Sequence, residues 1–325
     1  MNQYMLNTPI LLITFNRSYH ARKVLEVIRA QKPKQLFVFQ DGARNSNEKD
    51  DVNCAEVRQV VKELVDWDCE LNTYYSEVNL GCGPGPAAAI TWFFENVEQG
   101  IILEDDAVPN NDFFLYASEL LDRYKNNNEI MAIGSMNVDK QKWGDGSYYF
   151  TMMNRNLCAW ATWRRAWQTF DLNLSNISRR KLSCVLQKYG CGVLERAYWC
   201  DRLDEIHKDC QNNSSWDMQF FMSIWLQNKK GIIPNVNLSS NIGTIGEATH
   251  EMAVGNIIDN IPTQPILPLV HPSDDSVQKE ADKQFHFMYF EPNKDKWSWY
   301  LKYYNVFNRF IKRKLGIKGV LRKRN

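Results

Sequence analysis

The chain changes from apolar to acidic within the stretch Gly100-Ile-Ile-Leu-Glu-Asp-Asp-Ala-Val-Pro109. Ile101, Ile102 and Leu103 are apolar on both faces and too few for a helix, which is typical of a buried strand in a parallel sheet. We expect the three carboxylates that follow to lie at the carboxyl end of this strand, where open α/β sheets bind ligands. Because adjacent acids repel one another, this pattern predicts a Mg²⁺ or Mn²⁺ site shared with substrate phosphates. The alternative is a solvated acidic loop that favours the start of the next helix.

Strand and helix patterns alternate before this stretch. Strands are predicted at Pro9 to Phe15, Leu36 to Gln40 and Leu71 to Ser76, with helices at about Ser18 to Gln31 and Asn53 to Val65. This β-α-β-α-β order predicts a mostly parallel, doubly wound sheet with helices on its faces, that is, a Rossmann-like α/β fold.

A glycine-rich loop, Asn79-Leu-Gly-Cys-Gly-Pro-Gly-Pro86, follows the third predicted strand. Glycines let a backbone approach a ligand closely, and the next helix offers unpaired N–H groups to an anion, so Asn79 and Gly81 are candidate ligand contacts. A dinucleotide-binding loop is a weaker interpretation, because Pro86 replaces the last glycine of G-x-G-x-x-G. A plain helix start with proline near its first position explains the loop equally well.

The second half of the chain is rich in tryptophan. Trp160, Trp163 and Trp167 have the spacing of one helical face, which favours a core helix or, alternatively, one wall of a sugar site. Residues 171–213 are expected to form a helical insertion. Three further features follow: an amphipathic helix opening at Ser215 to Phe221, an edge strand at Ile232 to Leu238, and a loop ending at His250.

Length, composition and charge limit the class of protein. A chain of 325 residues with 44% hydrophobic residues can build a sizeable core. Eight cysteines without a C-x-x-C pair, and no export signal, predict reduced thiols in a cytoplasmic protein. Residues 294–325 contain 11 Lys or Arg and one acid, so this segment carries +10 and the preceding chain about −9.

This basic tail also contains aromatic residues. Trp299, Tyr303, Phe307 and Phe310 recur near one helical face, which is typical of a helix lying on an anionic membrane. The alternative is a helix that packs these rings on the domain. Nucleic acid is a poorer partner, because the body of the protein is acidic.

The ordered set of motifs resembles the GT-A class of nucleotide-sugar glycosyltransferases, in particular the inverting N-acetylglucosaminyltransferase I-like branch and its bacterial relatives. The resemblance covers about residues 8–255. It is carried by Pro9-Ile-Leu-Leu-Ile-Thr-Phe-Asn-Arg17, Gln40-Asp-Gly42, Glu104-Asp-Asp106 with Asp112-Phe-Phe-Leu-Tyr116, Trp160-Ala-Thr-Trp163, Trp216-Asp217, Asn241-Ile-Gly243 and Ala248-Thr-His250.

The resemblance implies a role for each matching position. Asp217 would be the general base, and Asp106 would ligate Mn²⁺ or Mg²⁺, with His250 approaching the same metal or the diphosphate. The expected contacts to the nucleotide sugar, UDP-linked by this resemblance, are Thr14, Phe15, Asn16, Arg17, Asp41, Asn79, Gly81, Glu104 and Asp105.

The sequence thus predicts a GT-A glycosyltransferase domain over residues 1–260, a linker over 261–293 and a membrane-associating tail over 294–325. A hexosyl- or N-acetylhexosaminyltransferase, peripheral on the inner membrane face, would use a glycan or lipid-linked acceptor such as a polysaccharide precursor. Two alternatives remain: a non-catalytic membrane-binding or membrane-disrupting protein, and a sugar-nucleotide pyrophosphorylase. The latter should carry a Gly-rich turn after the first strand, where this chain has Phe15-Asn-Arg-Ser18.

Overall fold

An eight-stranded, mostly parallel sheet forms the centre of the protein, as the sequence predicts. The computed structural model describes residues 5–152, 159–208, 215–244, 259–289, 306–311 and 314–315. The strand order is β3-β2-β1-β4-β8-β6-β9-β7, and β10 pairs with β5 in a separate two-stranded sheet. The strands are β1 (Ile10–Thr14), β2 (Gln35–Gln40), β3 (Glu70–Tyr75), β4 (Gln99–Glu104), β5 (Ala107–Pro109), β6 (Ile130–Gly134), β7 (Tyr148–Thr151), β8 (Ala159–Trp163), β9 (Lys230–Pro234) and β10 (Ser239–Asn241).

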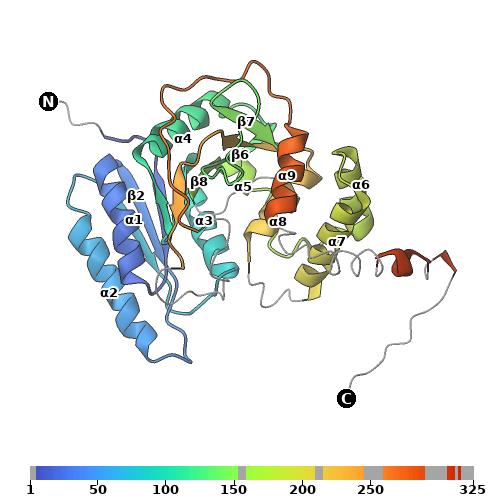
Figure 1. Cartoon of the computed structure of the whole chain (residues 1–325). Helices are drawn as coiled ribbons and strands as arrows, with labels where there is room; N and C mark the ends of the chain where they lie inside the picture. The colour runs from blue at the N-terminus through green and yellow to red at the C-terminus, as the bar shows by residue number, and fades with distance from the viewer. Residues whose placement is uncertain are drawn as a thin grey trace.

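Helices cover both faces of the sheet, which gives three layers. The helices α1, α2 and α4 pack on one face, and α3 and α5 pack on the other (Figure 1). The helices α6 and α7 pack against each other at the far side from α1 and α2 (Figure 1). The helices are α1 (Ser18–Gln31), α2 (Lys49–Leu64), α3 (Pro84–Asn96), α4 (Asn111–Tyr124), α5 (Arg164–Trp167), α6 (Arg179–Lys188), α7 (Val193–Lys208), α8 (Asp217–Leu226) and α9 (Lys279–Tyr289).

The first half of the fold follows the apolar pattern closely. Every residue of β1 is buried, and β4 is buried from Gly100 to Leu103, so both strands are covered by helices on both faces. In α1 the apolar residues Val24, Leu25 and Ile28 lie on one face and are fully buried against the sheet. The predicted helical insertion is also present, as α6 and α7.

The tryptophan-rich stretch differs from the prediction, because it is a strand and not a helix. β8 lies antiparallel between β4 and β6, so that Trp160 pairs with Ile102 and Trp163 with Gln99. Residues an odd number apart in a strand point to opposite faces, and Trp160 and Trp163 accordingly belong to different core clusters. Both side chains are buried, as the core interpretation requires.

Three later expectations also need correction. α8 is not amphipathic: Gln219 to Trp225 are all buried, because the helix packs against both core clusters. β9 is not an edge strand, since β7 pairs with it on the outer side, and Pro234 is tolerated at its last position. Much of the expected linker packs on the domain, where Asp282 of α9 accepts a hydrogen bond of 3.0 Å from the Met152 backbone N–H.

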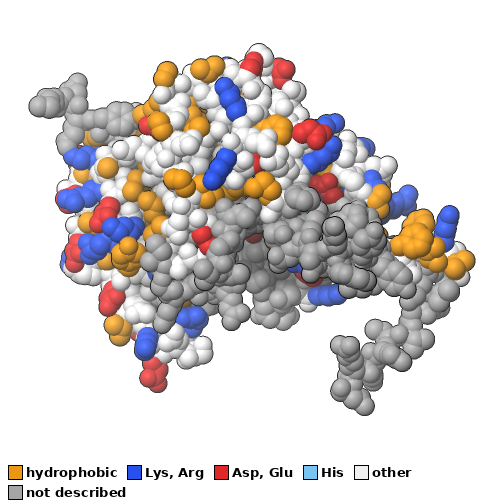
Figure 2. Space-filling model, in the orientation of Figure 1, with side chains coloured by type: hydrophobic (Ala, Val, Ile, Leu, Met, Phe, Trp, Pro, Cys, Tyr) orange, Lys and Arg blue, Asp and Glu red, His pale blue; other side chains and the backbone are white. Residues whose placement is uncertain are grey.

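No helix among the described residues is long and apolar enough to cross a membrane. Of the basic tail, residues 306–311 are helical, and Phe307, Phe310 and Leu315 are exposed. Figure 2 shows these apolar side chains beside a basic one at the right-hand edge of the molecule. Trp299 and Tyr303 lie outside the described residues.

Candidate functional site

The order in which the strands are added to the sheet reverses between β1 and β4. From β1 the chain proceeds outward to β2 and β3, then returns to β4 on the other side of β1, and all four strands are parallel. The register pairs Thr14 with Gln40 and Ile13 with Glu104, so these strands end at the same edge. Ligands of doubly wound sheets bind at such a switch point, outside the carboxyl ends of the strands.

Arg17 and the acidic triplet meet at this point. The Arg17 guanidinium is bonded to the Asp105 carboxylate through both Nη2 and Nε, and its Nη2 donates to Asp106 Oδ2 at 3.1 Å. The side chains of Arg17, Asp105 and Asp106 are 17%, 7% and 14% exposed, so this cluster is shielded from water. Arg17, from the turn after β1, and Asp105 and Asp106, which follow β4, therefore form one electrostatic unit.

Negative charge exceeds positive charge in this unit. Removal from water raises the pKa of Glu104 well above its ordinary value, and the charges of Asp106, Asp217 and Asp105 raise it further. The pKa of Asp106 is also raised, by burial and by Asp105, against the opposing effect of Arg17. Burial alone would lower the pKa of Arg17, but its two carboxylate partners raise it above its usual range. The cluster is thus suited to an additional cation or proton.

Asp217 joins the cluster from a distant part of the chain. Its preceding residue, Trp216, stacks on Trp160 with ring centroids 5.5 Å apart and planes at 26°. Because Trp160 pairs with Ile102 of β4, this stack sets the start of α8 beside the end of β4. Asp217 is among the negative charges that raise the pKa of Glu104.

The two-stranded sheet of β5 and β10 lies on another side of the site. β10 pairs with β5 directly after the acidic triplet, and the Ile242 backbone N–H donates to the Asp106 carbonyl at 2.9 Å. Gly243 lies so close that an added Cβ would be 2.6 Å from Asp106 Oδ2. The buried His20 of α1 contacts the Ile242 carbonyl oxygen through Nε2 at 3.1 Å. The predicted metal ligand His250 lies outside the described residues.

Asp41 organises the glycine-rich loop. Its carboxylate accepts backbone hydrogen bonds from Gly42, Leu80 and Gly81, at 2.8 to 2.9 Å, and a further one from the Asn79 amide at 3.1 Å. Burial raises the pKa of Asp41, although these backbone donors oppose the rise. Asp41, Asn79 and Gly81 are therefore brought together, with Asp41 serving as the anchor of the loop. Their contact with a nucleotide stays a prediction.

The turn after β1 depends on a residue that the sequence reasoning missed. Asn16 donates to Asp50 Oδ1 at 2.8 Å, and Arg44 Nε donates to Asp50 Oδ2 at 2.6 Å. Asp50 is fully buried in the first turn of α2. Phe15 lies under the Arg44 guanidinium, 5.3 Å from ring centroid to Cζ, and Thr14 donates to the Phe39 carbonyl at 2.9 Å. The helix was predicted to begin at about Asn53, so Asp50 lay just before its expected start, where an acid is too common to single out.

The pH dependence of stability tests the role of Asp50. Hydrogen bonding by Arg44 holds its pKa below the ordinary value of 3.8, despite the opposing effect of burial. A depressed pKa stabilises the fold above about pH 3.8, and this contribution is lost as the pH falls through the folded-state pKa. We expect Asp50→Asn to lower the free energy of unfolding by about 1–3 kcal/mol at pH 7 and by less at pH 3.

Urea unfolding at the two pH values measures this difference. The control is Asp51→Asn, which alters the exposed neighbouring acid and should change stability by under about 0.5 kcal/mol. An equal effect of Asp50→Asn at both pH values would contradict the assignment.

A hard divalent cation at this cluster stays a prediction. Carboxylate oxygens are the ligands that Mg²⁺ and Mn²⁺ prefer, and the cluster offers those of Glu104, Asp105 and Asp106, although Arg17 already compensates part of their charge. Within the described residues no group of three or more His, Cys, Asp or Glu side chains is arranged to hold a metal ion. A cation here would accordingly take few protein ligands and share the rest with substrate phosphates and water.

Comparisons with known proteins give the following picture. No protein-family model matches the chain, and no curated protein does. Similar solved structures include UDP-glucose pyrophosphorylase complexed with UDP-glucose, with 8% identity over 70% of this chain and 90% of that one and a TM-score of 0.37. The apo form of mouse xyloside xylosyltransferase 1 has 11% identity over 68% of this chain and 82% of that one, with a TM-score of 0.33.

Proposed function

We propose that the protein is a metal-dependent glycosyltransferase that uses a nucleotide-diphosphate sugar, UDP-linked in our expectation, and a hydroxyl group of a glycan or lipid-linked acceptor. The observation that supports this most is the meeting of Arg17, the triplet Glu104 to Asp106, and Asp217 at the switch point of the sheet. These groups combine a place for a diphosphate, a carboxylate suited to a cation, and a separate carboxylate suited to proton transfer.

Each group has a defined part in the proposed reaction. Asp217 takes the proton of the acceptor hydroxyl as its oxygen bonds to the anomeric carbon. The bond between that carbon and the diphosphate oxygen breaks, and the nucleoside diphosphate leaves with the electron pair. Arg17 holds positive charge next to the departing group, while Glu104 and Asp105 face the ribose and the sugar. A divalent cation held by Asp106, when bound, supplies further charge stabilisation, which is worth several kcal/mol.

Donor binding is the first test, because it needs no knowledge of the acceptor. Thermal unfolding of the wild type is recorded with a panel of nucleoside diphosphates and nucleotide sugars, each with and without Mn²⁺. We expect one base to raise the midpoint only with Mn²⁺, since binding at one hundred times Kd stabilises the folded state by about 2.7 kcal/mol. Asp106→Ala should lose this shift.

The matched control is Asp122→Ala, which removes an exposed acid of α4 bonded to Gln99. It should keep the metal-dependent shift. If a folded wild type responds to no nucleotide on the panel, the donor site is wrongly assigned and the membrane-binding alternative becomes the leading hypothesis.

We also propose that the basic tail holds the enzyme on an anionic membrane surface. The exposure of Phe307, Phe310 and Leu315 supports this, because apolar side chains exposed beside basic residues are typical of a helix at a membrane surface. For an enzyme held there, we expect the acceptor to be a glycan or a lipid-linked precursor at the inner membrane face.

A further inference from the structure

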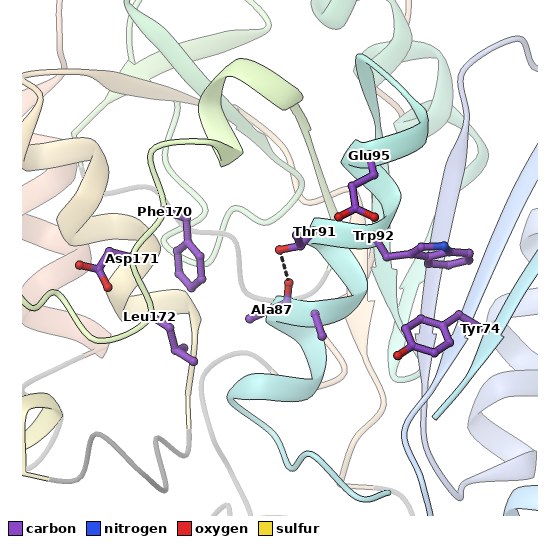
Figure 3. A pocket seen from close by; sticks show the side chains of 9 residues that line it. Tyr74, Ala87, Thr91, Trp92, Glu95, Phe170, Asp171 and Leu172 are labelled. Atoms are coloured by element: carbon purple, nitrogen blue, oxygen red, sulfur yellow. Dashed lines mark hydrogen bonds between the residues drawn. The ribbon is translucent and has the colours of Figure 1, made fainter. Parts of the chain in front are cut away.

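A shallow trough crosses the outer face of α3, on the side of the sheet opposite α1 and α2. Ala87 and Thr91 of α3 form its floor (Figure 3), and the neighbouring Ala88 also lines it. Phe170 and Leu172 lie on one side of the helix, and Trp92 and Tyr74 lie on the other (Figure 3). The trough has a volume of about 580 Å³ and is open to solvent. This volume lies in the range of ligand-binding clefts.

A second depression continues the trough along the same helix. It has a volume of about 450 Å³ and shares Thr91, Glu95 and Phe170 with the first. Trp167 forms part of its lining, which places one of the tryptophans expected in a sugar-site wall against this surface. Together the two depressions form an elongated surface, whose shape suits an extended ligand.

The aromatic walls are held rigidly from behind. Phe170 stacks on Trp167 with centroids 4.3 Å apart and planes at 16°, and the Trp167 indole N–H donates to Thr91 Oγ1 at 3.0 Å. Trp92 makes edge contacts with Phe37 of the core and with Tyr74, at centroid distances of 5.3 and 5.7 Å. Tyr74 is 43% exposed on the edge strand β3. Little side-chain entropy would therefore be lost when a ligand binds to these rings.

Hydrogen-bond acceptors accompany the rings. Glu95 and Asp171 line the first depression, and none of its described lining residues is basic. Arg164 lines the second depression, where its charge is compensated by Glu98 at 2.6 Å. Two carboxylates repel phosphate, sulfate and acidic lipid head groups, whereas they accept hydrogen bonds from hydroxyl groups. Flat aromatic faces next to acceptors match a ligand with apolar C–H faces and a rim of hydroxyl groups. These are the properties of a neutral sugar.

We propose that this α3 trough binds a neutral oligosaccharide, with sugar rings against Trp92, Tyr74 and Phe170 and hydroxyl groups donating to Glu95. Asp171 adds negative charge at the rim, since its carboxylate oxygens accept from the backbone N–H groups of Asn173 and Ser175 at 3.0 Å. The binding goes beyond the proposed transfer reaction, since it needs neither donor nor metal. Ala87 lies one helical turn from Pro84, where α3 leaves the glycine-rich loop, so the trough leads toward the candidate site. A glycan lying in the trough would extend from the α3 surface toward the reacting edge of the sheet.

Saturation-transfer NMR and titration by tryptophan fluorescence test the proposal in the absence of nucleotide and metal. The probes are maltohexaose, cellohexaose, chitohexaose and mannohexaose, with a hyaluronan hexasaccharide as the anionic comparison. We expect at least one neutral hexasaccharide to bind and the hyaluronan probe to bind more weakly. Trp92→Ala and Glu95→Ala should each weaken the affinity by about tenfold, which corresponds to about 1.4 kcal/mol.

Glu95→Ala and a control variant keep the test decisive. Glu95 is exposed, so Glu95→Ala should leave the thermal midpoint unchanged even if Trp92→Ala disturbs packing on Phe37. The control variant Tyr19→Ala removes an aromatic ring of α1 that is 53% exposed, and it should leave binding unchanged. The proposal is wrong if no neutral probe binds at millimolar concentration, if hyaluronan binds as well as the neutral probes, or if Glu95→Ala binds like the wild type. None of these outcomes depends on the donor site.

Discussion

Asp217→Asn should reduce the rate of sugar transfer by about 10²- to 10⁴-fold while leaving donor binding intact. The asparagine has the same shape as the aspartate, so α8 keeps its start on Trp216, but the amide cannot accept the proton of the acceptor hydroxyl. General-base catalysis contributes a factor of this size. The rate is measured as release of the nucleoside diphosphate from whichever nucleotide sugar gives the thermal shift, with isolated cell-surface glycans as the acceptor mixture.

A purely structural role for Asp217 predicts a different result. An acid in the first turn of a helix stabilises that helix by about 0.3–1 kcal/mol and has no reason to affect turnover. Glu280→Gln, in the first turn of α9, makes the same chemical change away from the site and should leave the rate unchanged. If Asp217→Asn shows the wild-type rate and only a small loss of stability, Asp217 is a helix-start acid and the base must be sought elsewhere.

Arg17→Met should lower the free energy of unfolding by about 3–5 kcal/mol at pH 7. Removing one partner of a shielded ion pair leaves the other charge without compensation, and losses of this size follow. Here one arginine faces two carboxylates, Asp105 and Asp106, with Glu104 next to them, so its loss exposes mutual repulsion as well. Equilibrium unfolding in guanidinium chloride measures the change.

A second arginine–aspartate pair provides the matched comparison. Arg29 and Asp66 also form an ion pair, but their side chains are 46% and 47% exposed, so Arg29→Met should change the free energy of unfolding far less than Arg17→Met does. Adding Asp105→Asn to Arg17→Met should recover part of the lost stability, because one of the uncompensated charges is removed. Equal losses for Arg17→Met and Arg29→Met would show that the cluster is solvated and that Arg17 does not neutralise it.

The sequence alone determined the local parts of the fold and the place of the site. Apolar runs such as Ile101 to Leu103 are too short for helices and apolar on both faces, so they had to be buried strands. Acids directly after such runs had to lie at the carboxyl edge, which is why Glu104 to Asp106 and Asp41 could be identified before the topology was known. These inferences depend on neighbours in the chain, whose geometry the backbone limits to a few forms.

Only the tertiary structure decided which distant residues meet there. Trp160 to Trp167 has a helical spacing, yet Ala159 to Trp163 form a strand because β4 and β6 offer backbone partners on both sides. The place of β8 between β4 and β6 lets Trp160 stack on Trp216. This stack sets the neighbouring Asp217 where its charge acts on Glu104. The hydrogen bond between Asn16 and Asp50 likewise depends on contact between remote segments. So does the α3 trough, which is built from β3, α3 and the segment at Phe170. Hydrophobic periodicity records which face of a segment is buried, but not the partner that buries it.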